Sequence, residues 1–504
     1  MKRKRAAAAV LAAVGMLALY SLPVLAVEPS RSYTYNEEKE AVPSPNGFQV
    51  QQVIYGKDLP CLSFSNAQDL FVDSDGNLYL LDSGNARVLL LDQSFAFVKE
   101  LSAFRWQGEE LTLSPGAEGI FYQEATGLLY IADTASDRIV VSDLEGTVRD
   151  VYEKPVSSLL EEGVPFAPKK LIVDNTGMLY VLSKNVNTGA LLIDQDHRFL
   201  GFYGTNDVKE TLTVRMERLW RGIMTEEQRK QSEYSFQPME FNNLFWSKDR
   251  FVYAVSQQNQ YLETEVSKLN ATGENILEVM PYGELTRRDD LPVAFADITV
   301  DEDGFFTIVD RNNGKLYQYD KSSNLLAVSG GIGQQEGLFS SPSAVGTNSR
   351  GELIVLDAKK NCLVVLEPTL YGEMIRESVK LYNQGLYLES IESWKEVLRM
   401  NFNFSLAYVG LGKAEMQQGN YAQAMSYFQK GGDQENYSAA KSALRDQRLE
   451  DHFGLVLLLA ATAVVAVLFC ESIGRFFRWL LAALSALPAR LSGGLSARKR
   501  RGAQ

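Results

Sequence analysis

A short β-turn motif recurs along most of this chain, and it limits the possible folds more than any other feature. In its first copy, VDSDGNLYLLDSGNARVLLLD, Asp75-Gly76 separates two apolar runs, and a second polar break begins at Asp82. Asp-Gly between such runs is a strong hairpin signal, because the tight turn needs a positive φ that glycine adopts freely. The turn position recurs in register six times, at Gly76, Gly127, Gly177, Arg250, Gly304 and Gly351.

The spacing of these copies predicts a β-propeller. Each copy supplies strands for a small antiparallel sheet, and copies roughly 40 to 55 residues apart are typical of propeller blades. We expect six blades over residues 48–368, with a helical insertion at 205–237 in the one long gap. The sixth copy supplies only three strands. We expect the alternating segment 48–55 to run antiparallel to residues 362–366 and close the ring, because closure removes an exposed sheet edge.

The copies resemble NHL repeats. The phrases DSDGNLYLLDSGNARVLLLD, EATGLLYIADTASDRIVVSD and DEDGFFTIVDRNNGKLYQYD each carry a Gly turn, an apolar strand with an aromatic or β-branched residue, a polar turn and a second strand that ends in Asp. The resemblance is strong in the first, second and fifth copies and weak in the fourth. It implies a six-bladed propeller but no single function, because such propellers serve both binding and catalysis.

From residue 371 the sequence period changes from that of strands to that of helices. Gly385 and Gly419 are 34 residues apart, and so are Trp394 and Phe428. This is the period of tetratricopeptide (TPR) repeats, and the segment QGNYAQAMSYFQKG resembles the second half of such a repeat. We expect two TPR-like repeats and a further helix within residues 371–450, with Trp394 and Phe428 buried between paired helices.

Both ends of the chain have the composition of membrane-targeting segments. Residues 1–26 have a basic start and an apolar stretch, as in a cleaved signal peptide; an uncleaved anchor is the alternative. Residues 27–47 are expected to form an extended leader. Residues 453–470 lack charge and are long enough for a transmembrane helix. In the basic tail, 471–504, the segment 476–487 is expected to lie at the inner membrane face or, alternatively, to form a second buried hydrophobic helix.

The basic tail places the C-terminus in the cytoplasm and the ectodomain outside, in a bacterial-type, single-pass membrane protein. The whole chain carries a formal charge of −13 although both ends are basic, so the predicted ectodomain is more acidic still. An acidic surface argues against nucleic acid as a partner.

Histidine is scarce, which restricts the possible chemistry. The chain has two, His197 and His452, and the second lies at the predicted membrane surface. A His-rich zinc site and a mechanism that needs a pair of histidines are therefore excluded. No residue is assigned a catalytic or cofactor-binding role.

Four aspartates recur six residues after the turn position and are the weak candidates for a metal site: Asp82, Asp133, Asp310 and Asp357. Carboxylates around a propeller channel would bind Ca²⁺ in a lactonase-like enzyme, so calcium is the one cofactor left open. A repeated position favours a structural role instead, in which each side chain accepts backbone N–H groups in the turn after the strand. Basic residues that could pair with these aspartates follow five positions later, at Arg87, Arg138 and Lys315.

Two cysteines, Cys61 and Cys362, lie in the predicted ectodomain, where disulfides persist. If residues 48–55 close the last blade, their end lies beside Cys362, and Cys61 follows a few residues later. The pair is therefore a disulfide candidate. Two separate buried thiols are the alternative.

The predicted fold is an all-β six-bladed propeller, an α-helical TPR-like domain and a C-terminal transmembrane helix. The first functional hypothesis is a membrane-anchored, extracytoplasmic binding or scaffold protein for a protein or glycan partner, by analogy an accessory to carbohydrate uptake or envelope assembly. The alternative is a propeller hydrolase with a carboxylate-held calcium ion. Scarce histidine and the helical repeats favour binding over an enzyme.

Overall fold

The computed structural model describes residues 32–36, 40–60, 63–160, 163–204, 240–256, 264–283 and 291–496. The chain forms two compact units, residues 1–411 and 412–504. The predicted signal peptide, the predicted helical insertion and Cys61 lie outside the described residues.

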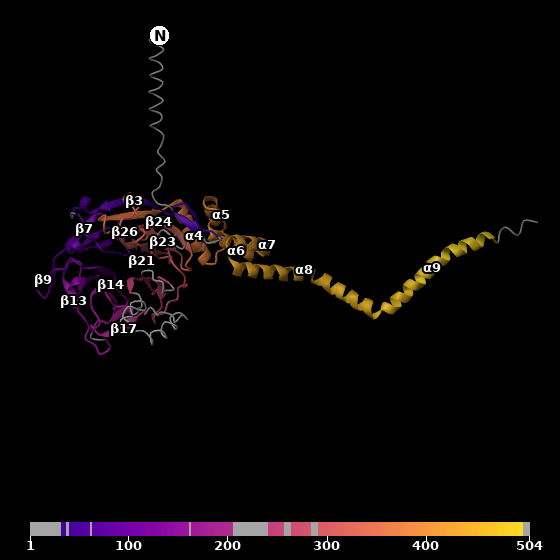
Figure 1. Ribbon diagram of the computed structural model, residues 1–504, viewed down its shortest axis with the longest axis horizontal. Coiled ribbons are helices and arrows are strands. Elements are labelled where there is room, and N and C mark those ends of the chain that lie inside the picture. Colours follow the sequence, from indigo (N-terminus) through magenta and orange to yellow (C-terminus); the bar gives the residue numbers. More distant parts are fainter. Residues whose placement is uncertain are drawn as a thin grey trace, which may run out of the picture. The chain divides into compact units, whose positions relative to one another are not determined.

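The first unit contains a six-bladed β-propeller, as the repeats predict (Figure 1). Each blade is an antiparallel sheet, and five of the six have four strands; the described part of the fourth has three. The strands are β4 (Asp69–Val72), β5 (Leu78–Asp82), β6 (Arg87–Leu91) and β7 (Phe97–Leu101) in blade 1; β10 (Gly119–Gln123), β11 (Leu128–Asp133), β12 (Arg138–Ser142) and β13 (Val148–Tyr152) in blade 2; β14 (Pro168–Val173), β15 (Leu179–Ser183), β16 (Ala190–Ile193) and β17 (Phe199–Tyr203) in blade 3; β18 (Phe241–Trp246), β19 (Val252–Ser256) and β20 (Val266–Leu269) in blade 4; β21 (Phe295–Val300), β22 (Phe306–Asp310), β23 (Lys315–Tyr319) and β24 (Leu325–Gly330) in blade 5; and β25 (Pro342–Thr347), β26 (Leu353–Asp357), β27 (Cys362–Pro368) and β3 (Phe48–Tyr55) in blade 6.

The turn between the first two strands of a blade has the predicted geometry. Gly76 has a φ of 86° and Gly304 a φ of 85°. Arg250, which takes the glycine position in the fourth copy, has a φ of 65°. Such values are uncommon for residues with a side chain. The fourth copy therefore keeps the hairpin without its glycine, which explains why its sequence signal is weak.

The ring closes through its N-terminal strand, as predicted. Strand β3 pairs antiparallel with β27, and the register joins Tyr55 to Cys362 and Phe48 to Pro368. In Figure 1 the indigo strand β3 lies among the orange strands of the last blade. This pairing covers the edge of β27, and β3 becomes the outer strand of blade 6.

Apolar side chains fill the space between neighbouring blades. The innermost strands contact one another in a closed circle, in which β25 of the last blade meets β4 of the first. Leu80 and Leu356 are fully buried in the cluster between these two blades. Because blades pack face to face in this way, every blade needs both neighbours to bury its sheet.

The predicted extended leader is partly folded in its described residues. It forms a hairpin, β1 (Tyr33–Tyr35) with β2 (Ala41–Pro43), and Tyr33 is buried in the apolar cluster of blade 5. The ammonium nitrogen of Lys315 lies 5.4 Å from the centroid of the Tyr33 ring. The polar composition of the segment gave no sign that Tyr33 is buried. A second small hairpin, β8 (Phe104–Trp106) with β9 (Glu109–Leu111), extends the link between blades 1 and 2.

Helix α4 (Leu370–Asn383) follows β27 after one residue and is fixed to the propeller. Thr369 caps the helix and donates a hydrogen bond to the Asn46 carbonyl (2.6 Å). Arg376 forms an ion pair with Asp301 (2.7 Å), and both side chains are largely buried. These contacts join the start of the helical region to blade 5.

Helix α5 (Ile391–Met400) packs against α4. Trp394 is fully buried, as predicted. The Asn401 amide, after the end of α5, donates to the Tyr371 hydroxyl (2.9 Å). The helix pair thus has its own small core within the first unit.

The second unit contains the end of α6 (Ser405–Gln417) and three further helices. These are α7 (Tyr421–Lys430), α8 (Gln434–Leu468) and α9 (Cys470–Ser496). Phe428 is fully buried, as predicted. The predicted further helix and the apolar segment form one continuous helix, α8. Its second half is long and apolar enough to cross a membrane.

Candidate functional site

A cavity of about 830 Å³ occupies the propeller channel. The innermost strands of all six blades form its wall, and the turns that follow these strands form its rim. Residues 69–74 of blade 1 and 120–125 of blade 2 illustrate the repeating lining. We call the rim end of the channel the turn face. A concave site of this size is large enough for a small ligand or a segment of a larger one.

Four polar side chains meet at the end of the cavity farthest from the rim. Asp69, Lys170, Asn243 and Asp297 come from four blades, and each is at most 9% exposed. The Lys170 ammonium nitrogen lies 2.5 Å from Asp69 Oδ1. The Asn243 side-chain amide donates a hydrogen bond to Asp297. We call these four residues the channel quartet.

The two carboxylates of the quartet also join blades through backbone groups. Asp69 Oδ2 accepts a hydrogen bond from the Ile120 amide (2.8 Å), and Asp297 Oδ2 accepts one from the Val345 amide (2.7 Å). Each acceptor lies in one blade and its donor in the next. The quartet therefore stabilises the inner ring as well as closing one end of the cavity.

Burial controls the electrostatics of the quartet. It raises the pKa of Asp69 and raises the pKa of Asp297 to about 7, because a charged carboxylate is poorly solvated there. The positive charge of Lys170 acts against this increase in the pKa of both groups. The ionisation of the two carboxylates thus depends on one buried ammonium group.

Between the quartet and the rim the wall is largely apolar and aromatic. Phe71, Tyr122, Phe245 and Trp246 line this part and remain half-buried, so their rings are partly open to the cavity. The ring centroids of Phe71 and Tyr122 are 6.5 Å apart. Aromatic faces of this kind pack against apolar, glycan or cationic groups.

The rim is polar and charged. Ser74 donates hydrogen bonds to Glu124 through its backbone amide (2.8 Å) and its hydroxyl (2.5 Å), which links the turns of blades 1 and 2. Lys248 and Glu302 form an exposed ion pair between the turns of blades 4 and 5. The cavity thus combines a polar rim, an aromatic wall and a charged end.

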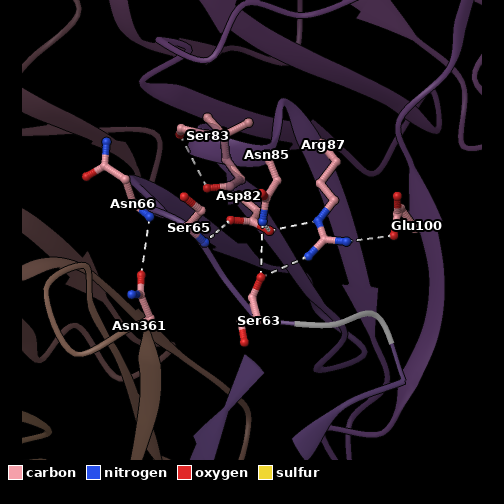
Figure 2. A network of polar contacts seen from close by, with 10 residues as sticks. Ser63, Ser65, Asn66, Asp82, Ser83, Asn85, Arg87, Glu100 and Asn361 are labelled. Atoms are coloured by element: carbon pink, nitrogen blue, oxygen red, sulfur yellow. Dashed lines mark hydrogen bonds and ion pairs between the residues drawn. The ribbon is translucent and has the colours of Figure 1, made fainter. Parts of the chain in front are cut away.

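The recurrent aspartates occupy a different place, at the end of each second strand. Asp82 is fully buried and accepts hydrogen bonds from the Ser65 amide (2.7 Å), the Asn85 side chain (2.8 Å) and Arg87 Nε (2.7 Å). Figure 2 shows this network, in which Arg87 also reaches Glu100. The carboxylate is held by groups of blade 1 and of the link that leads into it.

The other three recurrent aspartates have the same kind of environment. Asp133 accepts a hydrogen bond from the Ser114 amide (2.9 Å). It also forms an ion pair with Arg138 (2.9 Å), as predicted from the five-residue spacing. Asp310 accepts from the Ala294 amide (3.0 Å). Asp357 is bound by several backbone amides, among them those of Ser340 and Ser341.

The structure does not bring these four aspartates together. They lie in four blades, at the end of the channel opposite the turn face, because each second strand runs antiparallel to the innermost strand. Across the described residues no three His, Cys, Asp or Glu side chains form a group that could hold a metal ion.

Cys362 begins β27, and it is buried and paired in register with Tyr55. Burial and the neighbouring Asp357 raise the pKa of its thiol to about 11. The disulfide with Cys61 stays a prediction, because Cys61 lies outside the described residues.

The shared repeat pattern did not indicate the channel quartet. The quartet occupies one repeat position, seven residues before the turn, where the other blades carry Ile120 and Ala344. Four copies carry a charged or polar side chain at that position, whereas the next position is apolar in every copy. This difference between copies is the signal that could have identified the site. A repeat search emphasises what the copies share, whereas this site depends on how they differ.

No family model and no curated protein matches the chain. Among solved structures, the chain is similar to an auxiliary nutrient binding protein from Bacteroides thetaiotaomicron (13% identity, 67% of this chain and 75% of that chain, TM-score 0.39). It is also similar to a gluconolactonase from Xanthomonas campestris (13%, 68% and 96%, 0.37) and to virginiamycin B lyase from Staphylococcus aureus (9%, 64% and 100%, 0.39). At these identities and TM-scores the comparisons assign no function to this chain.

Proposed function

We propose that this protein is a membrane-anchored binding protein of the cell exterior, which captures part of a protein or glycan partner in its propeller channel. The observation that carries the proposal is the cavity of about 830 Å³ with its aromatic wall and polar rim. Ligand sites are typically concave and largely apolar, with a few polar groups that fix orientation. The cavity has this composition, and its walls belong to the inner strands of a closed ring.

The alternative function, a calcium-dependent propeller hydrolase, has less support. The recurrent aspartates are held by backbone amides of their own blades and of the links that lead into them, and Lys170 faces Asp69 in the channel. A calcium ion needs six to eight oxygen ligands around one point. Calorimetric titration of the purified protein with CaCl₂ tests this alternative: tight binding at one site would favour the hydrolase.

The helical region and the apolar half of α8 complete the proposal. According to this proposal, the helices within residues 371–450 form a TPR-like surface for a protein partner. Residues 453–470 then anchor the ectodomain in the membrane, with the basic tail in the cytoplasm. Protease added to intact cells should then remove the propeller and leave a C-terminal tag intact. Digestion of the tag would refute this topology.

A blocked channel provides the direct test of the binding role. Thr347 lies at the half-buried end of β25 and lines the cavity, so Thr347→Trp would fill part of it. The matched control is Val98→Trp on the outer strand of blade 1, where Val98 is 50% exposed. Partners captured from native membranes, or glycans bound on an array, should be lost with Thr347→Trp and kept with Val98→Trp. Equal capture by both variants would refute a role for the channel.

A further inference from the structure

The corner of the cavity between blades 1 and 2 combines aromatic faces with carboxylates. Phe71 and Tyr122 line it, and Tyr122 stacks on Tyr79 with ring centroids 4.5 Å apart. Asp73 and Glu124 line the same corner, each three residues before its turn glycine. Two partly open rings therefore lie beside two acidic groups.

These two carboxylates are bound by neutral donors. Asp73 accepts from the Asn77 backbone (2.8 Å) and side chain (2.9 Å) and from the Tyr79 hydroxyl (3.2 Å). Glu124 accepts from the backbone and hydroxyl of Ser74. The hydrogen bonds fix their positions and leave their negative charge in place.

The cavity as a whole has more acidic than basic groups. Its lining contains six carboxylates and one lysine, namely Asp69, Asp73, Glu124, Asp297, Asp301, Glu302 and Lys248. Ion pairs neutralise three of the six, through Lys170 with Asp69, Arg376 with Asp301 and Lys248 with Glu302. Among the residues that the structure describes, Asp73 and Glu124 have no cation within ion-pair distance. A ligand with a positive charge would balance this excess.

The geometry favours an organic cation over a metal ion. Asp73 and Glu124 belong to different blades, and the described residues include no group of three ligand side chains around one point. A metal ion needs several oxygen atoms at close range. A diffuse ammonium or guanidinium charge is stabilised by aromatic faces together with a single carboxylate.

We propose that this corner binds an alkylammonium or guanidinium group, which rests against Phe71 and Tyr122 and is balanced by Asp73 and Glu124. The inference relies on the proposed function in one respect, that the channel is a ligand site. Such a group belongs either to a basic side chain of a protein partner or to a free small amine. The aromatic rings select for the flat or methylene-rich part of the ligand, and the carboxylates select for its charge.

The test uses the full-length protein in detergent and calorimetric titration with four probes. These are the peptide N-acetyl-Gly-Arg-Gly-amide, the same peptide with neutral citrulline in place of arginine, the free amine agmatine, and neutral N-acetylglucosamine. The arginine peptide or agmatine should bind at least about tenfold more tightly than the citrulline peptide, and added salt should weaken that binding. Binding of agmatine alone would identify a free amine as the ligand, and binding of the peptide alone a protein side chain.

Three variants locate the interaction. Tyr122→Leu should weaken binding of the charged probe about five- to thirtyfold through loss of the aromatic face. Glu124→Gln should weaken it about three- to tenfold and reduce its salt dependence. Glu145→Gln, which removes an exposed carboxylate outside the cavity, should leave binding unchanged.

Equal affinity for the arginine and citrulline peptides, or no binding of any charged probe, would overturn the inference. It would also fail if Tyr122→Leu and Glu145→Gln had the same effect. The proposed function is judged by other results. If Thr347→Trp still abolishes partner capture, the channel is a ligand site for a neutral group; if it does not, both proposals fail.

Discussion

Replacement of Lys170 by methionine should destabilise the propeller in a way that depends strongly on pH. Its ammonium group lies 2.5 Å from Asp69 and opposes the increase in the pKa of Asp297. Methionine keeps most of the side-chain volume and removes the charge. The variant would then bury two carboxylates with no compensating cation.

The magnitude follows from the cost of breaking a buried ion pair. Removing one partner typically costs about 3–5 kcal/mol, and we expect a loss in this range at pH 8. A carboxyl whose pKa is raised in the folded state stabilises the fold at low pH and loses that contribution as pH rises through the folded pKa. Without Lys170 the pKa of Asp69 and of Asp297 increases further. The destabilisation should therefore grow between pH 5 and pH 8, by at most about 1.4 kcal/mol per pH unit for each additional proton bound.

Denaturant unfolding of the full-length protein in detergent, followed by the β-sheet circular dichroism signal, measures this effect. The control is Lys99→Met, because Lys99 forms only an exposed pair with Glu145 and should change stability by about 0–1 kcal/mol. The double variant Asp69→Asn with Lys170→Met should recover part of the loss at pH 8. An equal loss at pH 5 and pH 8, or no recovery in the double variant, would show that Lys170 acts through packing rather than charge.

Four further outcomes test other parts of the structure. Asp82→Ala should cost about 3–5 kcal/mol in the same unfolding experiment, because it removes the buried carboxylate that accepts hydrogen bonds from Ser65, Asn85 and Arg87. An unchanged midpoint would contradict a structural role. Arg376→Ala should speed amide hydrogen exchange in α4 while exchange in the propeller strands stays slow; unchanged exchange would show that the ion pair does not hold the helix. Phe428→Ala should cost about 3–5 kcal/mol of local stability in the helical region, seen as faster proteolysis there. Mass spectrometry of the non-reduced protein should find Cys61 joined to Cys362, and two free thiols would refute the disulfide.

The architecture of the propeller could be predicted because its signals are local and repeated. Gly76 and its equivalents mark turns, and the turns fix the strand order of each blade. The closing strand was also predictable, since the sixth copy lacked an outer strand and the segment 48–55 alternates. Burial of Trp394 and Phe428 followed from the 34-residue spacing.

The candidate site could not be predicted in the same way, because it depends on residues far apart in sequence. Asp69 and Lys170 are about one hundred residues apart and meet only because the blades form a ring. The contact of Arg376 with Asp301 likewise depends on how α4 packs on blade 5. Neither pair has a local pattern. The hairpin that contains Tyr33 was missed since a polar segment with a few tyrosines resembles a linker.

The pairing of β3 with β27 has a consequence for how the protein is made. The N-terminal strand appears first during synthesis, yet its partner, Cys362–Pro368, emerges more than three hundred residues later. Contacts between such distant segments form slowly, because a long loop must close before they do. Until then β3 is an unpaired strand exposed to neighbouring nascent chains. Its exposed positions carry glutamines, Gln49, Gln51 and Gln52, but the strand has neither a charge nor a proline, so its protection from aggregation depends on closure of the ring.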